Sequence, residues 1–126
     1  MNLIDYLEPL GSDNITFGTT DEFGHYVFPN HGNLSIDSLN SGDIVIIGIP
    51  YFMNHQLEYT ASSDLVRREL YLLVGHDSYH CKIIDAGDLK RGKNVMETLY
   101  ALKDLLDLLR ERGVLTLLIG GSNIFN

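Results

Sequence analysis

Three strand-like runs separated by two helix-like segments constrain the fold of this chain more than any other feature. The runs cover residues 43–50, 82–88 and 114–119, and the first and third are almost entirely apolar. Continuous apolar runs are typical of parallel strands that are buried on both faces. Strands that alternate with helices form βαβ units with right-handed crossovers. Residues 43–120 are therefore expected to form a βαβαβ unit with a parallel sheet.

Both connecting segments carry signals for helix ends. The segment 62–73 opens with Ser-Ser-Asp, which offers an N-cap and a first-turn acid, and its helix is expected to end before Gly75. The second helix is expected to begin at Asn94, because Glu97 three residues later makes a start that is similar to a capping box. A wide apolar stripe follows, and Gly113 suits the position after the last turn.

The N-terminal third of the chain is less regular. We expect residues 1–42 to form an N-terminal extension that packs on a core domain of residues 43–126. Residues 3–10 indicate a short helix or an irregular packing segment, because their apolar side chains recur at helical spacing before Pro and Gly. Residues 14–29 favour a hairpin or two short antiparallel strands. Residues 30–42 are rich in Asn, Gly, Ser and Asp, which favours a loop.

Composition excludes several classes of protein. The net charge of −8 and the pI of about 4.8 argue against binding to nucleic acid or to an anionic membrane surface. No apolar run approaches the roughly 18 residues of a membrane span, and the first residues do not resemble a signal peptide. Cys81 is the single cysteine, so the chain can form no intramolecular disulfide. A cytoplasmic location is the resulting expectation.

Familiar cofactor motifs are missing from the sequence. No Gly-x-Gly-x-x-Gly follows the strand at 43–50, and the sequence contains no P-loop. The five histidines lack the spacing of a zinc site, so each is interpreted as a surface or loop residue. A nucleotide-binding domain therefore remains only a third alternative for the function.

Candidate site residues gather where the three runs end. In open α/β sheets, ligands bind beyond the carboxyl ends of the strands, which here are marked by Pro50, Asp85, Asp88, Gly120 and Gly121. The two aspartates could bind a metal or a substrate, or they could hydrogen-bond the backbone of the turn between them. The two glycines could permit close approach of a ligand, or they could form a simple exit turn.

These segments together resemble the ureohydrolase family, which comprises arginase, agmatinase and formimidoylglutamase. The resemblance covers about residues 43–126 and is closest to a divergent, formimidoylglutamase-like bacterial branch, with residues 1–42 as its N-terminal extension. It rests on four segments in the family's order: the strand Asp43-Ile-Val-Ile-Ile-Gly-Ile-Pro50, the helix Leu65-Val66-Arg67-Arg68-Glu69-Leu70-Tyr71, the strand Ile84-Asp85-Ala86-Gly87-Asp88 and the strand end Leu118-Ile119-Gly120-Gly121.

The resemblance implies a three-layer α/β/α fold in which the first three core strands lie in the order 2-1-3. In active members two Mn²⁺ ions activate a hydroxide that attacks the carbon of a guanidinium or formimino group. Asn123 stands at the position of a metal-binding histidine, and Ser122 stands at the preceding aspartate. A neutral amide is a weak ligand for a transition metal. The family's later Asp-x-His-x-Asp and Asp-x-Asp motifs do not occur in these 126 residues.

We therefore expect an N-terminal fragment of a ureohydrolase-like protein that is inactive by itself, with no catalytic residue and no cofactor assigned to this chain. Its partner is expected to be the missing C-terminal half. The apolar strand at 114–119 would form an open edge, which predicts self-association or a C-terminal tail folded over that edge. The alternative is a non-catalytic α/β pseudoenzyme, a module that binds a small ligand without metal.

Overall fold

The computed structural model describes residues 3–9, 22–49, 62–73, 75 and 81–120 of the chain. These residues form an α/β fold, as the sequence predicts, and their one sheet has five strands, two more than the predicted core. The elements are β1 (Leu7–Glu8), β2 (Val27–Pro29), β3 (Ile44–Ile49), α1 (Ser62–Leu70), β4 (Ile83–Leu89), α2 (Val95–Glu111) and β5 (Leu115–Gly120), with 3₁₀ helices at Leu3–Asp5, Phe23–Tyr26 and Ile36–Ser38.

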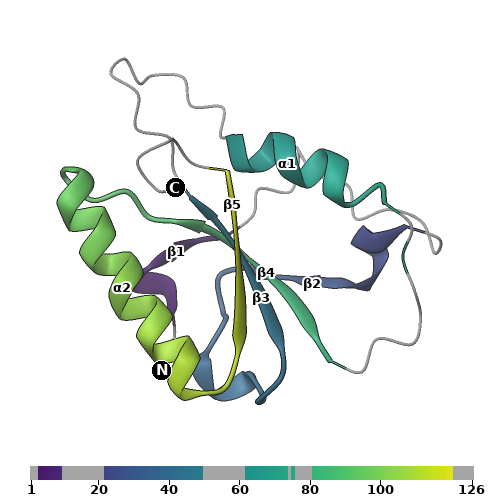
Figure 1. Ribbon diagram of the computed structural model, residues 1–126, viewed down its shortest axis with the longest axis horizontal. Helices are drawn as coiled ribbons and strands as arrows, with labels where there is room; N and C mark the ends of the chain where they lie inside the picture. The colour runs from purple at the N-terminus through teal and green to yellow at the C-terminus, as the bar shows by residue number, and fades with distance from the viewer. Residues whose placement is uncertain (1–2, 10–21, 50–61, 74, 76–80, 121–126) are drawn as a thin grey trace.

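The centre of the sheet has the predicted parallel topology. β3 lies between β4 and β5 and pairs with both of them in parallel, so the order is β4-β3-β5 (Figure 1). This is the 2-1-3 order that the resemblance implies for the core strands. The same order occurs in many doubly wound sheets, so it supports the α/β class rather than one family.

The N-terminal segment contributes strands to the sheet as well as cover. β1 pairs antiparallel with the end of β4, and β2 pairs in parallel with its beginning. We expected residues 14–29 to pair with each other in antiparallel. β2 instead pairs in parallel with β4, which lies more than 50 residues later in the sequence. The other half of the expected hairpin, residues 15–17, lies outside the described residues. The residues directly before β2 form a 3₁₀ helix, Phe23–Tyr26.

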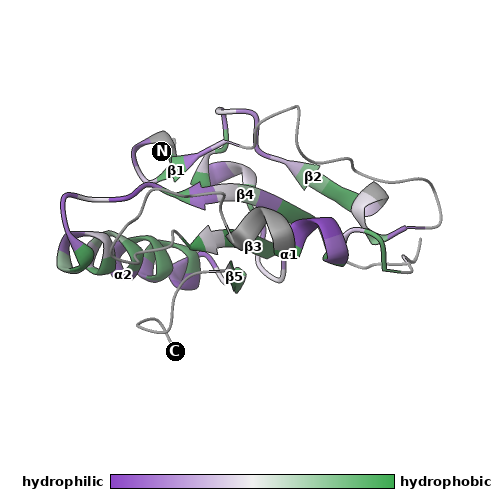
Figure 2. Ribbon diagram, turned by 90° about the horizontal axis from the view of Figure 1, so that it is seen from above, coloured by the Kyte–Doolittle hydropathy of each residue, from purple (hydrophilic) through white to green (hydrophobic). Residues whose placement is uncertain are grey.

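Two apolar clusters hold the two helices to opposite faces of the sheet. Strand residues alternate between faces, so Val45 and Ile47 pack with α2, while Ile46 packs beside Tyr71 at the end of α1. In Figure 1, α2 lies to the left of the sheet and α1 to its upper right. Figure 2 shows the strands as mainly hydrophobic and much of α1 as hydrophilic. Leu3, Leu7 and Leu39 are buried in the cluster under α2, which ties the N-terminal segment to the core.

The ends of α2 are the predicted ones. The Asn94 side chain accepts a hydrogen bond from the backbone N–H of Glu97 at 2.8 Å, which makes Asn94 the N-cap. The Glu97 carboxylate accepts from the N–H of Lys93 at 3.1 Å rather than from that of the cap itself. Gly113 has a φ of 79°, the left-handed conformation expected directly after a helix.

The end of α1 differs from the prediction. The helix begins at Ser62, within the Ser-Ser-Asp segment that the sequence predicts for its start. It ends at Leu70 instead of reaching Leu73, because the last turn tightens: the N–H groups of Leu72 and Leu73 bond to carbonyls three residues earlier. Within the described part of the chain, no helix combines the length and the apolar character needed to cross a membrane.

Candidate functional site: the carboxyl ends of β3, β4 and β5

The carboxyl ends of the three core strands meet at one edge of the sheet, as the topology requires. Asp85 and Asp88 lie on β4, and Gly120 is the last residue of β5, with a φ of 76°. Gly48 of β3 stands beside Asp88 on one side and Ile119 on the other, so β3 separates the aspartates from the glycine. Pro50, Gly121, Ser122 and Asn123, the other candidates, lie outside the described residues.

A β-bulge brings the two aspartates to the same partner. Residues three apart on a regular strand point to opposite faces, so Asp85 and Asp88 would normally face away from each other. The pairing between β3 and β4 shifts register between Ile46 and Gly48, so that β4 carries one residue more than its partner. Gly87 absorbs the extra residue with a φ of 92°. Both aspartates can therefore contact the same side chain.

That side chain is Arg67 of α1, which is completely buried between the helix and the sheet. Its Nε lies 2.8 Å from Asp85 Oδ2 and its Nη2 lies 2.9 Å from Asp85 Oδ1, which is a bidentate pair. Nη1 bonds to Asp88 Oδ1 at 2.8 Å, and Nη2 also donates to the carbonyl oxygen of Gly87 at 3.0 Å. One guanidinium thus binds Asp85, Gly87 and Asp88 of the bulge, which lies inside β4 rather than in a turn after the strand, because β4 continues to Leu89.

The Asp85 carboxylate accepts hydrogen bonds from three residues. Besides Arg67, the Tyr71 hydroxyl donates to Oδ2 and the backbone N–H of Gly87 donates to Oδ1 at 3.1 Å. The last contact is the backbone hydrogen bond that the turn interpretation predicts. Asp85 is 0% exposed, whereas the Asp88 side chain is 28% exposed. Asp85 therefore acts as an internal anchor, and Asp88 is the carboxylate of the pair that solvent can reach.

Burial and ion pairing act against each other in this cluster. Burial raises the pKa of the Asp85 carboxyl above its ordinary value, while the hydrogen bond and charge of Arg67 oppose that rise. Burial alone would lower the pKa of Arg67, but its hydrogen bonds and its attraction to Asp85 and Asp88 outweigh burial and raise it. Arg67 is therefore a permanent positive charge inside the protein, and the carboxylates are what make its burial tolerable.

Arg67 and Tyr71 belong to this cluster but are not among the site residues that the sequence predicts. They are four residues apart and lie on the same side of the chain as it leaves α1. A signal is present in the sequence, because a helix packed on a buried strand that contains Asp85 needs a cation to neutralise it. Arg67 and its neighbour Arg68 were equally able to supply that charge, and the structure leaves Arg68 exposed.

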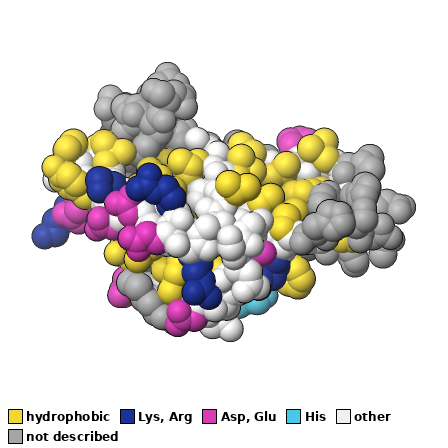
Figure 3. Space-filling view, turned by 60° about the horizontal axis from the view of Figure 1, so that its bottom comes forward, with side chains coloured by type: hydrophobic (Ala, Val, Ile, Leu, Met, Phe, Trp, Pro, Cys, Tyr) yellow, Lys and Arg dark blue, Asp and Glu magenta, His cyan; other side chains and the backbone are white. Residues whose placement is uncertain are grey.

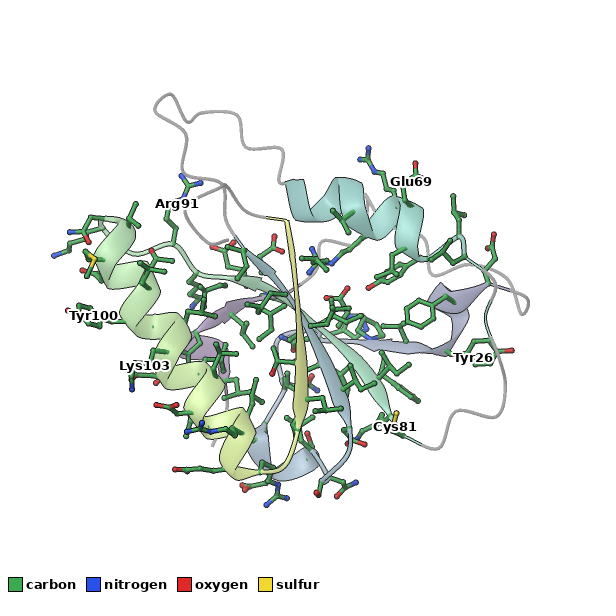
Figure 4. The ribbon with its side chains drawn as sticks, viewed as in Figure 1. Tyr26, Glu69, Cys81, Arg91, Tyr100 and Lys103 are labelled. Carbon is green, nitrogen blue, oxygen red and sulfur yellow. The ribbon has the colours of Figure 1, made fainter. Side chains whose placement is uncertain are left out.

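Surface depressions of the described residues lie elsewhere, and two of them are the following. One of about 370 Å³ runs along α2, and one of about 260 Å³ lies between β2 and the start of β4. Neither of these two includes Asp85 or Asp88. The described residues contain no group of three or more His, Cys, Asp or Glu side chains that could hold a metal ion. Figure 4 shows Cys81 just before the start of β4.

Comparisons with protein-family models, with curated proteins and with solved structures found no match for this chain.

Proposed function

We propose that this chain is the scaffold part of a ureohydrolase-like protein, whose family reaction is the hydrolysis of non-peptide C–N bonds in linear amidines. The contact between Arg67 and Asp85 carries the proposal. The resemblance rests partly on the helix segment 65–71, which contains Arg67, and partly on the strand segment 84–88, which contains Asp85. These two segments are 18 residues apart in the sequence at the contact, and they are direct partners in the structure.

The arrangement of the elements is compatible with the arginase-like three-layer fold that we propose. The strand order β4-β3-β5, the parallel pairing and the placement of α1 and α2 on opposite faces all support it. In such a fold the bulge at Asp85–Asp88 borders the site, and Arg67 holds this bulge in place from the side of α1. Arg67 is thus a positioning residue in the proposal, and it does not contact the substrate.

The metal chemistry in this proposal depends on residues beyond the described ones. Mn²⁺ in active family members supplies a hydroxide nucleophile at neutral pH. Asn123 and Ser122 stand where the family has His and Asp, and the other two ligand motifs are absent from residues 1–126. We therefore propose that the chain alone is inactive, that a C-terminal half supplies the missing ligands, and that the protein works in the cytoplasm.

The test combines Mn²⁺ calorimetry with an amidine hydrolase assay. The assay measures urea released from arginine or agmatine, and formamide released from formimidoylglutamate. Both measurements are made on the 126-residue chain alone and on an assembly of this chain with the proposed C-terminal half, which would carry the Asp-x-His-x-Asp motif. We expect no tight Mn²⁺ binding by the chain and two ions bound by the assembly. Tight binding of two ions and hydrolysis by the chain alone would contradict the scaffold role.

A substitution at the motif sharpens this test. Asn123→His introduces an imidazole at the proposed ligand position, so it should tighten Mn²⁺ binding by the assembly. Asn126→His is the matched control, because it makes the same chemical change three residues away. Equal effects of the two substitutions would show that residue 123 has no special relation to the metal.

The alternative function is a pseudoenzyme that binds a small ligand without metal. The contacts of Asp85 favour this metal-free alternative, because both of its carboxylate oxygens already accept hydrogen bonds from the protein. The two proposals differ in their metal dependence. If the assembly binds no Mn²⁺ even with Asn123→His in place, the metal-free binding module is the better description.

A further inference from the structure

The outer edge of β5 presents backbone groups that are ready to pair with another strand. Within the described residues, β5 pairs only with β3, and Figure 1 shows it in front of that strand. The N–H of Leu115 donates to the carbonyl oxygen of Asp43 at 2.9 Å, so Leu115 directs its backbone inward. Because the direction alternates along a strand, Thr116 and Leu118 direct their N–H and C=O groups outward.

The side chains along this edge are apolar and exposed. Leu115 is 64% exposed, Leu117 45% and Leu118 41%. Natural edge strands are usually protected by a charged residue, a proline or a bulge, and the sequence of β5, Leu-Thr-Leu-Leu-Ile-Gly, contains no charge and no proline. Figure 3 shows charged side chains of both signs on the α2 side of the molecule, with exposed hydrophobic side chains toward the middle of the same face.

We propose that β5 pairs antiparallel with β5 of a second copy of this chain, with the two-fold axis at Leu117. In this register Thr116 of each copy forms a hydrogen-bonded pair with Leu118 of the other, which satisfies the outward backbone groups. Leu117 meets its own counterpart, and Leu115 meets Ile119. None of these cross-strand pairs contains a charged side chain, so the two-fold symmetry places no like charges directly opposite each other.

The size and charge of the contact predict a weak, salt-dependent dimer. A six-residue strand pair buries less than the roughly 800 Å² per partner of a standard interface, so weak association is expected. Each copy carries a net charge of −8, and the resulting repulsion is screened by salt. The dimer should therefore tighten several-fold between 20 mM and 300 mM NaCl. The inference does not depend on the proposed function.

Site-directed disulfide formation tests the register. In a Cys81→Ser background, Leu117→Cys places two thiols opposite each other, with Cα atoms about 4.5 Å apart, within the range of a disulfide. Leu115→Cys is the matched control, because this residue is more exposed but lies roughly 13 Å from its counterpart in the same register. We expect Leu117→Cys to give a covalent dimer on oxidation and Leu115→Cys to stay monomeric. Equal cross-linking of both would indicate random collision and overturn the proposal.

A charge placed on the axis provides a second, independent test. Leu117→Lys puts two cations opposite each other, so sedimentation equilibrium should show dimerisation weakened at least tenfold. Tyr100→Lys is the control, because Tyr100 is 63% exposed and projects from α2 away from the sheet (Figure 4). A wild-type chain that stays monomeric at about 1 mM in 300 mM NaCl contradicts the proposal. In a chain that stays monomeric, protection of the Thr116 and Leu118 amides from hydrogen exchange would show that another part of the same chain covers the edge of β5.

Discussion

Removal of the buried cation at Arg67 should destabilise the fold by an amount that depends on pH. Arg67→Met keeps most of the apolar stem of the side chain and deletes only the guanidinium. The deletion removes two hydrogen bonds to Asp85 and one each to Asp88 and Gly87. Removing one partner of a buried ion pair usually costs about 3–5 kcal/mol. The remaining donors to Asp85, the Tyr71 hydroxyl and the Gly87 N–H, cannot replace a full charge.

Protonation of Asp85 sets an upper limit on the part of this loss that comes from its unpaired charge. The ordinary pKa of the carboxyl is 3.8, and one unit corresponds to 1.36 kcal/mol, so neutralising Asp85 costs about 4 kcal/mol at pH 7 and about 1.6 kcal/mol at pH 5. Without Arg67 the pKa of Asp85 in the folded state rises further above its unfolded value. The folded variant then binds an extra proton, so its stability falls as pH increases through that raised pKa. The deficit relative to wild type should therefore widen from pH 5 to pH 7.

Urea denaturation followed by circular dichroism at both pH values measures the deficit. The control is Arg68→Met, the same change at the neighbouring exposed residue of α1, which should shift the free energy of unfolding by less than about 0.5 kcal/mol. The double variant Arg67→Met/Asp85→Leu should recover much of the loss, because it leaves no unpaired charge buried. If Arg67→Met costs no more than Arg68→Met, or costs the same at both pH values, the buried-charge argument is wrong.

Three further predictions concern other parts of the fold. Gly87→Ala should lower the free energy of unfolding by at least about 2 kcal/mol in urea titrations, because a Cβ would lie 2.0 Å from the carbonyl oxygen of Glu8 and the φ is 92°. Asn94→Ala should cost about 1 kcal/mol in the same assay through loss of the α2 N-cap. The hydrogen bond and charge of Lys103 lower the pKa of Asp107 in the folded protein. The stability from this ion pair is therefore present above the pKa that Asp107 has in the unfolded chain, and it is lost as pH falls through the lower pKa of the folded state. Melting curves of Asp107→Asn and wild type should therefore differ slightly at pH 7 and converge in acid.

The core of the fold was predictable because its signals are local. The runs that form β3, β4 and β5 are recognisable from a few consecutive residues each, and Asn94 and Gly113 mark the ends of α2 by their own side-chain and backbone chemistry. β1 and β2 were not predictable in the same way. Each is only two or three residues long and owes its existence to β4, so no local pattern specifies its partner.

The candidate site shows the same division between local and distant information. Asp85 and Asp88 were recognised as strand-end acids, and the sequence was compatible with either a ligand site or a turn. The choice depends on a bulge at Gly87 and on a guanidinium 18 residues earlier in the chain, and neither is visible at the aspartates themselves. A strand-end acid should therefore be assigned as a ligand only after buried arginines on the preceding helix have been considered. In this chain Arg67 engages both oxygens of Asp85, so any ligand chemistry at this turn must come from Asp88 or from residues outside it.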